Sequence, residues 1–172
     1  MTTGDAPAVP FKIPSVVTEI GARARLKGIN LVRTQCELTG ALRPGEQIPE
    51  VKFETRGGAT RPAEAPGTLI CAFGLEVIGL GPKPDLVRVA RFSCDYAIQY
   101  EFDAPFLQAQ ADKDLSLFAA YNASLHAWPH VREFIQSMAF RMTLPPIVLP
   151  IMRTLDMVGP PENWKKLTPK AT

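Results

Sequence analysis

The stretch Ala90-Arg-Phe-Ser-Cys-Asp-Tyr-Ala-Ile-Gln-Tyr-Glu-Phe102 decides the fold class of this chain. Its even-numbered positions are apolar or aromatic, and its odd-numbered positions are mostly polar. Such alternation is typical of a β-strand with one buried face and one face toward water, an arrangement that antiparallel sheets allow. The pattern therefore predicts a long strand of an antiparallel sheet.

The sequence before this strand predicts three more strands. The first of them places Val32, Cys36 and Leu38 on one face, and the second alternates apolar Val51 and Phe53 with charged residues. Glycine and proline residues end the third. We expect these strands at residues 29–39, 51–54 and 68–80, and a short helical turn before them at residues 18–27.

The apolar period changes from two to about 3.6 after Phe102, which predicts helices. The first helix has Asp114 as its expected N-cap, and the second starts near a junction at Trp128-Pro129, because proline suits a first helical turn. Strands followed by helices predict an α+β fold, a four-stranded antiparallel sheet with two main helices packed on one side. The expected apolar stripes are Leu117, Phe118, Tyr121 and Leu125 on the first helix, and Val131, Phe134, Ile135, Met138 and Met142 on the second.

The chain length of 172 residues fits one domain of ordinary size. Most of its 17 prolines lie near the N-terminus, at 44–66 and at 144–169, where we expect loops or extended chain. We therefore expect a single domain at 18–158, with flexible tails at 1–17 and 159–172.

Charge and hydropathy narrow the class of protein. The chain has 19 Lys and Arg against 17 Asp and Glu, so it lacks the basic field that nucleic-acid binding needs. Neither a secretory signal nor a run of the roughly 20 apolar residues that span a bilayer is evident. Cys36, Cys71 and Cys94 form no paired motif and are typical of buried free thiols. We expect a cytoplasmic protein that binds no nucleic acid and does not insert into membranes.

The sequence also argues against catalysis. The fragment Gly79-Leu-Gly-Pro82 lacks the Lys-Ser/Thr of a phosphate-binding loop, and no nucleophile elbow is present. The only two histidines, His126 and His130, could bind a metal with Glu133, but Pro129 lies between them and metal sites use three or four ligands. We expect no catalytic residue, no metal and no cofactor.

The segment Leu144-Pro-Pro-Ile-Val-Leu-Pro-Ile-Met152 is apolar and contains three prolines. Neither a helix nor a central strand can form around these prolines, so the segment is expected to lie extended along a surface. Its side chains either cover the sheet or contribute to an exposed apolar groove.

Three stretches, Phe118-Ala-Ala-Tyr-Asn122, Trp128-Pro-His-Val-Arg-Glu-Phe-Ile-Gln-Ser-Met138 and Leu144-Pro-Pro-Ile-Val-Leu149, together resemble the helical half of the SecB chaperone family. Upstream, Pro49-Glu-Val-Lys-Phe53 resembles the second SecB strand, and the alternating segment 86–102 resembles the fourth. The likeness spans about residues 29–155.

This resemblance implies an ATP-independent holdase that binds unfolded polypeptides and keeps them competent for export or assembly. It also implies a homotetramer, a dimer of dimers formed through sheet edges and first helices, and an ion-pair role for Arg132 and Glu133 at the helix junction. The implied client groove lies between the crossover after the first strand, the second strand and the second helix. Its candidate residues are Phe53, Trp128, Phe134, Met138, Phe140, Leu144, Ile147, Leu149 and Ile151, and the candidates for assembly are Tyr96, Phe118, Tyr121 and Leu125.

The chain departs from export-type SecB proteins, whose acidic sheet face docks the translocase motor SecA. Arg88, Arg91 and Ser93 stand on the corresponding strand, and Lys165 and Lys166 replace an acidic tail. Residues 21–35 and 159–164 look closer to solitary SecB-like chaperones that protect antitoxins. The expected clients are therefore preproteins, with SecA as a partner, or an antitoxin. A small-molecule-binding or enzymatic domain on the same fold is the alternative from another class.

Overall fold

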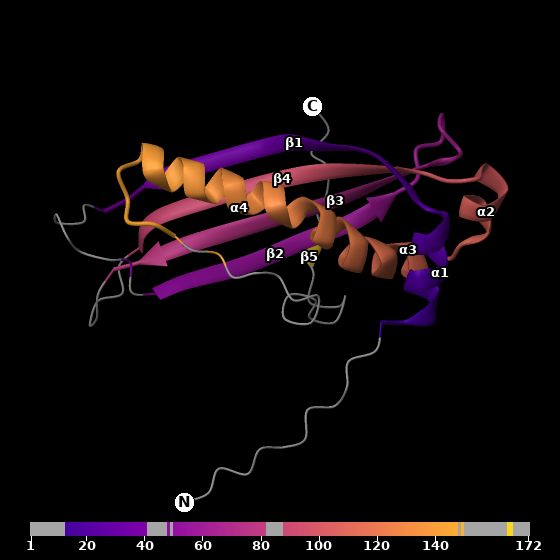
Figure 1. Cartoon of the computed structure of the whole chain (residues 1–172), viewed down its shortest axis with the longest axis horizontal. Helices are drawn as coiled ribbons and strands as arrows, with labels where there is room; N and C mark the ends of the chain where they lie inside the picture. The colour runs from indigo at the N-terminus through magenta and orange to yellow at the C-terminus, as the bar shows by residue number, and fades with distance from the viewer. Residues whose placement is uncertain are drawn as a thin grey trace, which may run out of the picture.

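The computed structural model describes residues 13–40, 48, 50–81, 88–147, 149 and 165–166. It shows a sheet with its main helices on one face, and the long helix α4 crosses the strands diagonally (Figure 1). Most of the predicted tails, 1–17 and 159–172, lies outside the described residues. Ser15 to Val17 belong to a helix, and Val17 is buried.

The sheet has the strand order β1-β4-β3-β2-β5. The four long strands pair antiparallel, which confirms the predicted four-stranded antiparallel sheet. A two-residue strand, β5, adds to the free edge of β2 in parallel. The bounds are β1 Arg25–Leu38, β2 Glu50–Thr60, β3 Thr68–Leu80, β4 Arg88–Glu101 and β5 Lys165–Lys166.

The alternation of β4 is realised as predicted. Phe92, Cys94 and Ile98 are fully buried beneath the helices. The polar residues between them lie on the opposite face, because successive side chains of a strand point to opposite sides. β4 lies between β1 and β3, so its register fixes both neighbours.

Strand β1 differs from its prediction. It starts at Arg25, and two register shifts leave Lys27 and Val32 without a register partner on β4. Leu31 is paired with Tyr96 and therefore lies on the side of the sheet that faces the helices. The predicted alternation had assigned this place to Val32. A bulge inserts one residue and so changes the face on which later residues lie. The predicted alternation therefore holds for Cys36 and Leu38 and is interrupted at Val32.

Two main helices, α3 and α4, lie on one face of the sheet, as predicted (Figure 1). The helical turn expected at 18–27 is instead the helix α1, which starts and ends earlier. Helix α2 was not predicted; Asp103 caps it by accepting a hydrogen bond of 3.3 Å from the backbone N–H of Phe106. The bounds are α1 Ser15–Arg23, α2 Ala104–Ala109, α3 Asp112–Phe118 and α4 Ser124–Arg141, with the π-helical turn η1, Ala119–Ala123, between α3 and α4.

The junction predicted at Trp128-Pro129 was wrong, because α4 continues through Pro129. The irregularity lies upstream, at η1, where the Ser124 hydroxyl donates to the backbone oxygens of Ala120 and Tyr121 at 2.6 and 3.0 Å. A π turn shifts the phase of the residues around it.

The apolar stripe predicted for the first helix was therefore only partly right. Of its four residues only Phe118 is fully buried, and Leu125 is 45% exposed. The face toward the sheet instead carries Leu115 and small residues such as Ala123 and Ala127. On α4, the predicted stripe is confirmed: Val131 and Ile135 are buried, and Phe134, Met138 and Met142 are partly buried against the core.

Candidate functional site

The chain reverses direction directly after α4. Thr143 has a φ of 56°, in the left-handed region, and the backbone N–H of Leu144 donates to the carbonyl of Ala139 at 3.0 Å. This hydrogen-bond pattern is a Schellman-type helix end, which usually uses glycine at the left-handed position. The turn directs the following residues back over the sheet (Figure 1).

The extended segment after this turn covers the sheet. Ile147 and Leu149 are 3% and 0% exposed and belong to the same buried cluster as Phe73 and Phe92. Of the two alternatives for residues 144–152, covering of the sheet therefore holds for these two side chains. Leu144, at the start of the segment, is only partly buried.

An apolar surface remains along one side of α4. Phe134, Met138 and Met142 recur at a spacing of four, so they lie on one side of the helix, and Leu144 follows them. All four pack against the core and keep part of their surface exposed. We call these four residues the α4 flank. Methionine suits such a surface because its flexible side chain adapts to different contacts.

The structure divides the predicted groove residues into three groups. Trp128, Ile147 and Leu149 are buried inside the protomer, whereas Phe134, Met138 and Leu144 belong to the α4 flank. Phe53 on β2 and Phe140 on α4 are exposed, at 42% and 84%. Phe140 is two positions beyond Met138, which places it on the opposite side of the helix. Ile151 lies outside the described residues.

The aromatic residues of β4 hold α4 on the sheet. The Tyr96 hydroxyl donates to the backbone oxygen of His130 at 3.2 Å, and the Tyr100 hydroxyl lies 2.7 Å from Nδ1 of His126. Burial raises the pKa of Tyr96 to about 12, and burial lowers the pKa of His126. Both tyrosines are therefore neutral supports of the helix.

Two of the residues predicted for assembly are internal to the protomer. Tyr96 and Phe118 are buried, Tyr121 is half-buried, and Leu125 is exposed. A different apolar surface, on the edge strand β1, was not among the predicted site residues. Its members are exposed by 45–66%: Leu26, Leu31, Val32 and Leu38. The alternation in the sequence placed Val32 and Leu38 on a strand, but it gives no sign that these side chains are left uncovered in the protomer.

The ion-pair role implied for Arg132 and Glu133 has no counterpart in the described part of the chain. No salt bridge there involves either residue, and Nε of Arg132 is buried without a hydrogen-bond partner. The two residues are adjacent on α4, and adjacent helical residues do not face each other.

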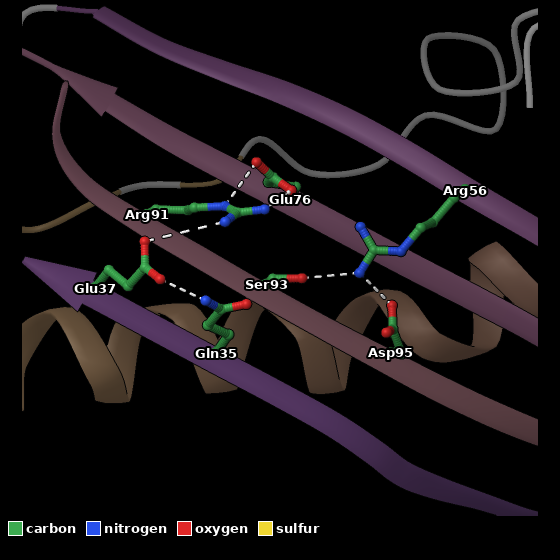
Figure 2. Close-up of polar contacts among 7 residues, drawn as sticks. All are labelled: Gln35, Glu37, Arg56, Glu76, Arg91, Ser93 and Asp95. Atoms are coloured by element: carbon green, nitrogen blue, oxygen red, sulfur yellow. Dashed lines mark hydrogen bonds and ion pairs between the residues drawn. The ribbon is translucent and has the colours of Figure 1, made fainter. Parts of the chain in front are cut away.

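The face of the sheet away from α4 carries a network of ion pairs (Figure 2). Arg91 forms two hydrogen bonds of 2.8 Å with Glu76 and lies 4.0 Å from a carboxylate oxygen of Glu37. The hydrogen bond from Arg91 lowers the pKa of Glu76.

Further along the same face, Arg56 donates to Ser93 at 2.8 Å and pairs with Asp95. Three carboxylates of this face thus each have an arginine neighbour, and the face is not acidic.

Among residues 13–40, 50–81 and 88–147, no group of three or more His, Cys, Asp or Glu side chains is arranged to hold a metal ion. No described helix combines the length and apolar character needed to cross a membrane.

Known proteins with a similar sequence or structure exist, although no protein-family model matches the chain. Two curated relatives, the SecB-like chaperones Rv1957 and MT2006 of two Mycobacterium tuberculosis strains, are each 24% identical to it, and each alignment covers 87% of this chain and 88% of the relative. The solved structure of M. tuberculosis Rv1957 with a ChAD peptide from the HigA1 antitoxin matches with a TM-score of 0.64 and 20% identity, over 81% of this chain and 97% of that one. In sequence the chain is thus similar to SecB-like chaperones, and its fold is similar to that of the solved Rv1957 structure.

Proposed function

We propose that the protein is an ATP-independent holdase chaperone that binds extended segments of unfolded polypeptides along the α4 flank and the neighbouring part of β2. The observation that carries this proposal is the apolar surface along one side of α4. Its residues are packed against the core but remain partly exposed: Phe134, Met138, Met142 and Leu144. Phe53 on the edge strand β2 is a further exposed apolar side chain.

The physical basis is hydrophobic burial. An unfolded chain offers apolar side chains and unpaired backbone groups, and transfer of its apolar surface from water to the α4 flank is favourable without nucleotide hydrolysis. Curated relatives named as chaperones support this proposal over an enzymatic function.

For the client, we propose an antitoxin. The relative Rv1957 was solved with an antitoxin peptide. The export alternative, with preproteins as clients and SecA as partner, has less support, because the carboxylates of Glu37, Glu76 and Asp95 on the outer sheet face are paired with arginines. To dock SecA as an acidic surface, this sheet face would need carboxylates that are not paired with arginines.

We further propose assembly into a homotetramer, a dimer of dimers, in the cytoplasm. Exposed Leu31, Val32 and Leu38 on β1, together with Leu125 on α4, supply an apolar surface that a second copy can cover. Free thiols at Cys71 and Cys94 suit a reducing compartment.

Suppression of aggregation tests the holdase. Light scattering of a chemically denatured client protein, diluted into buffer with stoichiometric amounts of the chain, is expected to stay low with wild type and to rise with Phe134→Asp. A carboxylate on the α4 flank removes apolar contact and opposes burial, so we expect client affinity to fall at least about tenfold, as for a hot-spot residue.

The matched control is Gln136→Asp, which adds the same charge to an exposed position of the same helix. It should hold the client as wild type does. Leu149→Asp should instead unfold the chain, because Leu149 is fully buried. Wild-type protein that fails to suppress aggregation would refute the proposal.

Native purification from the source cell separates the two client classes: one dominant small antitoxin supports the client proposed here, whereas SecA with many preproteins supports export.

A further inference from the structure

Strand β5 occupies part of the sheet edge beside the proposed client site. Lys165 and Lys166 pair in parallel with Arg56 and Gly57 of β2 (Figure 1). In the described part of the chain β5 is the only strand on this edge, so the rest of β2 has no strand partner there.

The β2 edge is well suited to accept an extended chain. Its register with β3 is continuous from Glu50 to Thr60, without a bulge and without proline. Natural sheets usually protect their edges with such features, because a regular edge offers unpaired N–H and C=O groups to any extended segment. The opposite edge, β1, has two register shifts and is protected in this way.

We infer that the chain's own residues 165–166 are an internal competitor for the β2 edge, and that they must leave it before an extended client can pair with Arg56 and Gly57. This inference rests on the proposed function, because it concerns access to the same client site. The competing contact is between backbones, so it depends on backbone groups of residues 165–166 that point toward β2 rather than on their side chains.

The competitor is both effective and displaceable. A segment of the same chain competes intramolecularly, and intramolecular competitors act at effective concentrations on the order of millimolar. Pairing over only two residues is nevertheless marginal, since isolated short strands are barely stable. If β5 occupies the edge for about half to nine-tenths of the time, the apparent client affinity is reduced by about 2- to 10-fold.

Proline substitution tests the inference in the full-length chain. The double variant Lys165→Pro/Lys166→Pro removes both N–H groups and keeps the tether, whereas Lys165→Gln/Lys166→Gln removes the same charges and keeps the N–H groups. Reduced, carboxymethylated α-lactalbumin, a permanently unfolded protein, serves as the client, and its affinity is measured by titration. Amide hydrogen exchange over residues 50–60 without client reports the pairing itself.

We expect the proline variant to bind the client about 2- to 10-fold more tightly and to exchange faster over residues 50–60, with the glutamine variant like wild type in both measurements. Equal affinity of the proline variant and wild type would overturn the inference, as would tighter binding by the glutamine variant. If none of the three proteins binds the client, the proposed function itself fails, and the inference fails with it.

Discussion

Arg56 on β2 pairs with Asp95 on β4 across the intervening strand β3 (Figure 2). Gly74 on β3 lies opposite both residues, because Arg56 and Asp95 are its register partners on the two sides. A β-carbon at Gly74 would lie 2.3 Å from Oδ1 of Asp95 and 2.7 Å from Nε of Arg56. The missing side chain is therefore what allows the arginine to span three strands.

The first prediction concerns this glycine. Gly74→Ala should lower the free energy of unfolding by about 1–3 kcal/mol, as overpacking does, because the methyl group must displace the ion pair. Urea denaturation measures the loss. In an Arg56→Ala background the same substitution should cost clearly less, since Arg56 then neither crowds the added methyl group nor holds Asp95 over it. An equal loss in both backgrounds would contradict the explanation.

The second prediction concerns assembly. Val32→Asp should shift the protein to smaller species in size-exclusion chromatography with light scattering, because it places a charge on a side chain that is 66% exposed in the protomer and proposed to be covered in the assembly. Asn30→Asp adds the same charge to an exposed position of β1 and should leave the assembly unchanged. A wild-type monomer would rule out the proposed tetramer.

The third prediction is a dependence of stability on pH. Burial lowers the pKa of His126, so the unfolded chain binds a proton more readily than the folded chain. The free energy of unfolding should therefore decrease as the pH falls below about 6.5, the ordinary pKa of histidine, and continue to decrease until the lower folded pKa is passed. His126→Asn should flatten the curve between pH 7.5 and pH 5, measured by urea denaturation. An unchanged slope in this variant would assign the effect to other groups.

The fourth prediction concerns the three thiols. Cys71 and Cys94 are fully buried, and burial raises the pKa of Cys94 to about 12. Since the thiolate is the reactive form, a thiol reagent should label at most Cys36 in the native protein. All three should react once urea unfolds the chain. Rapid labelling of Cys71 in native protein would show that the sheet opens more readily than its burial indicates.

The fold could be predicted largely from periodicity. In β4 the alternation of Phe92 to Tyr100 is regular, because one face of a central strand is buried against helices along its whole length. In β1 the predicted period is interrupted at Val32, because a bulge adds a residue there. The phase error in the first helix has a similar cause, the π turn after Phe118.

The site could be predicted only in part. Phe134 and Met138 lie on a partly exposed apolar surface, as the groove prediction requires, but Trp128, Ile147 and Leu149 are buried. A sequence cannot separate these groups, because a side chain that covers a core and one that lines a groove are both apolar. Roles in client binding and assembly stay predictions. The Arg56–Asp95 pair joins residues 39 positions apart, a separation that no local pattern reports.

The reversal at Thr143 bears on how the proposed client preference can change during evolution. One short stretch supplies both the partly exposed Leu144 and the fully buried Leu149, so under the proposed function it serves client recognition at one end and folding at the other. Substitutions at Leu149 are limited by the stability of the whole domain, since large core truncations cost several kcal/mol. New client preferences can therefore arise mainly at positions such as Phe134 and Met138, where side-chain changes leave the interior intact.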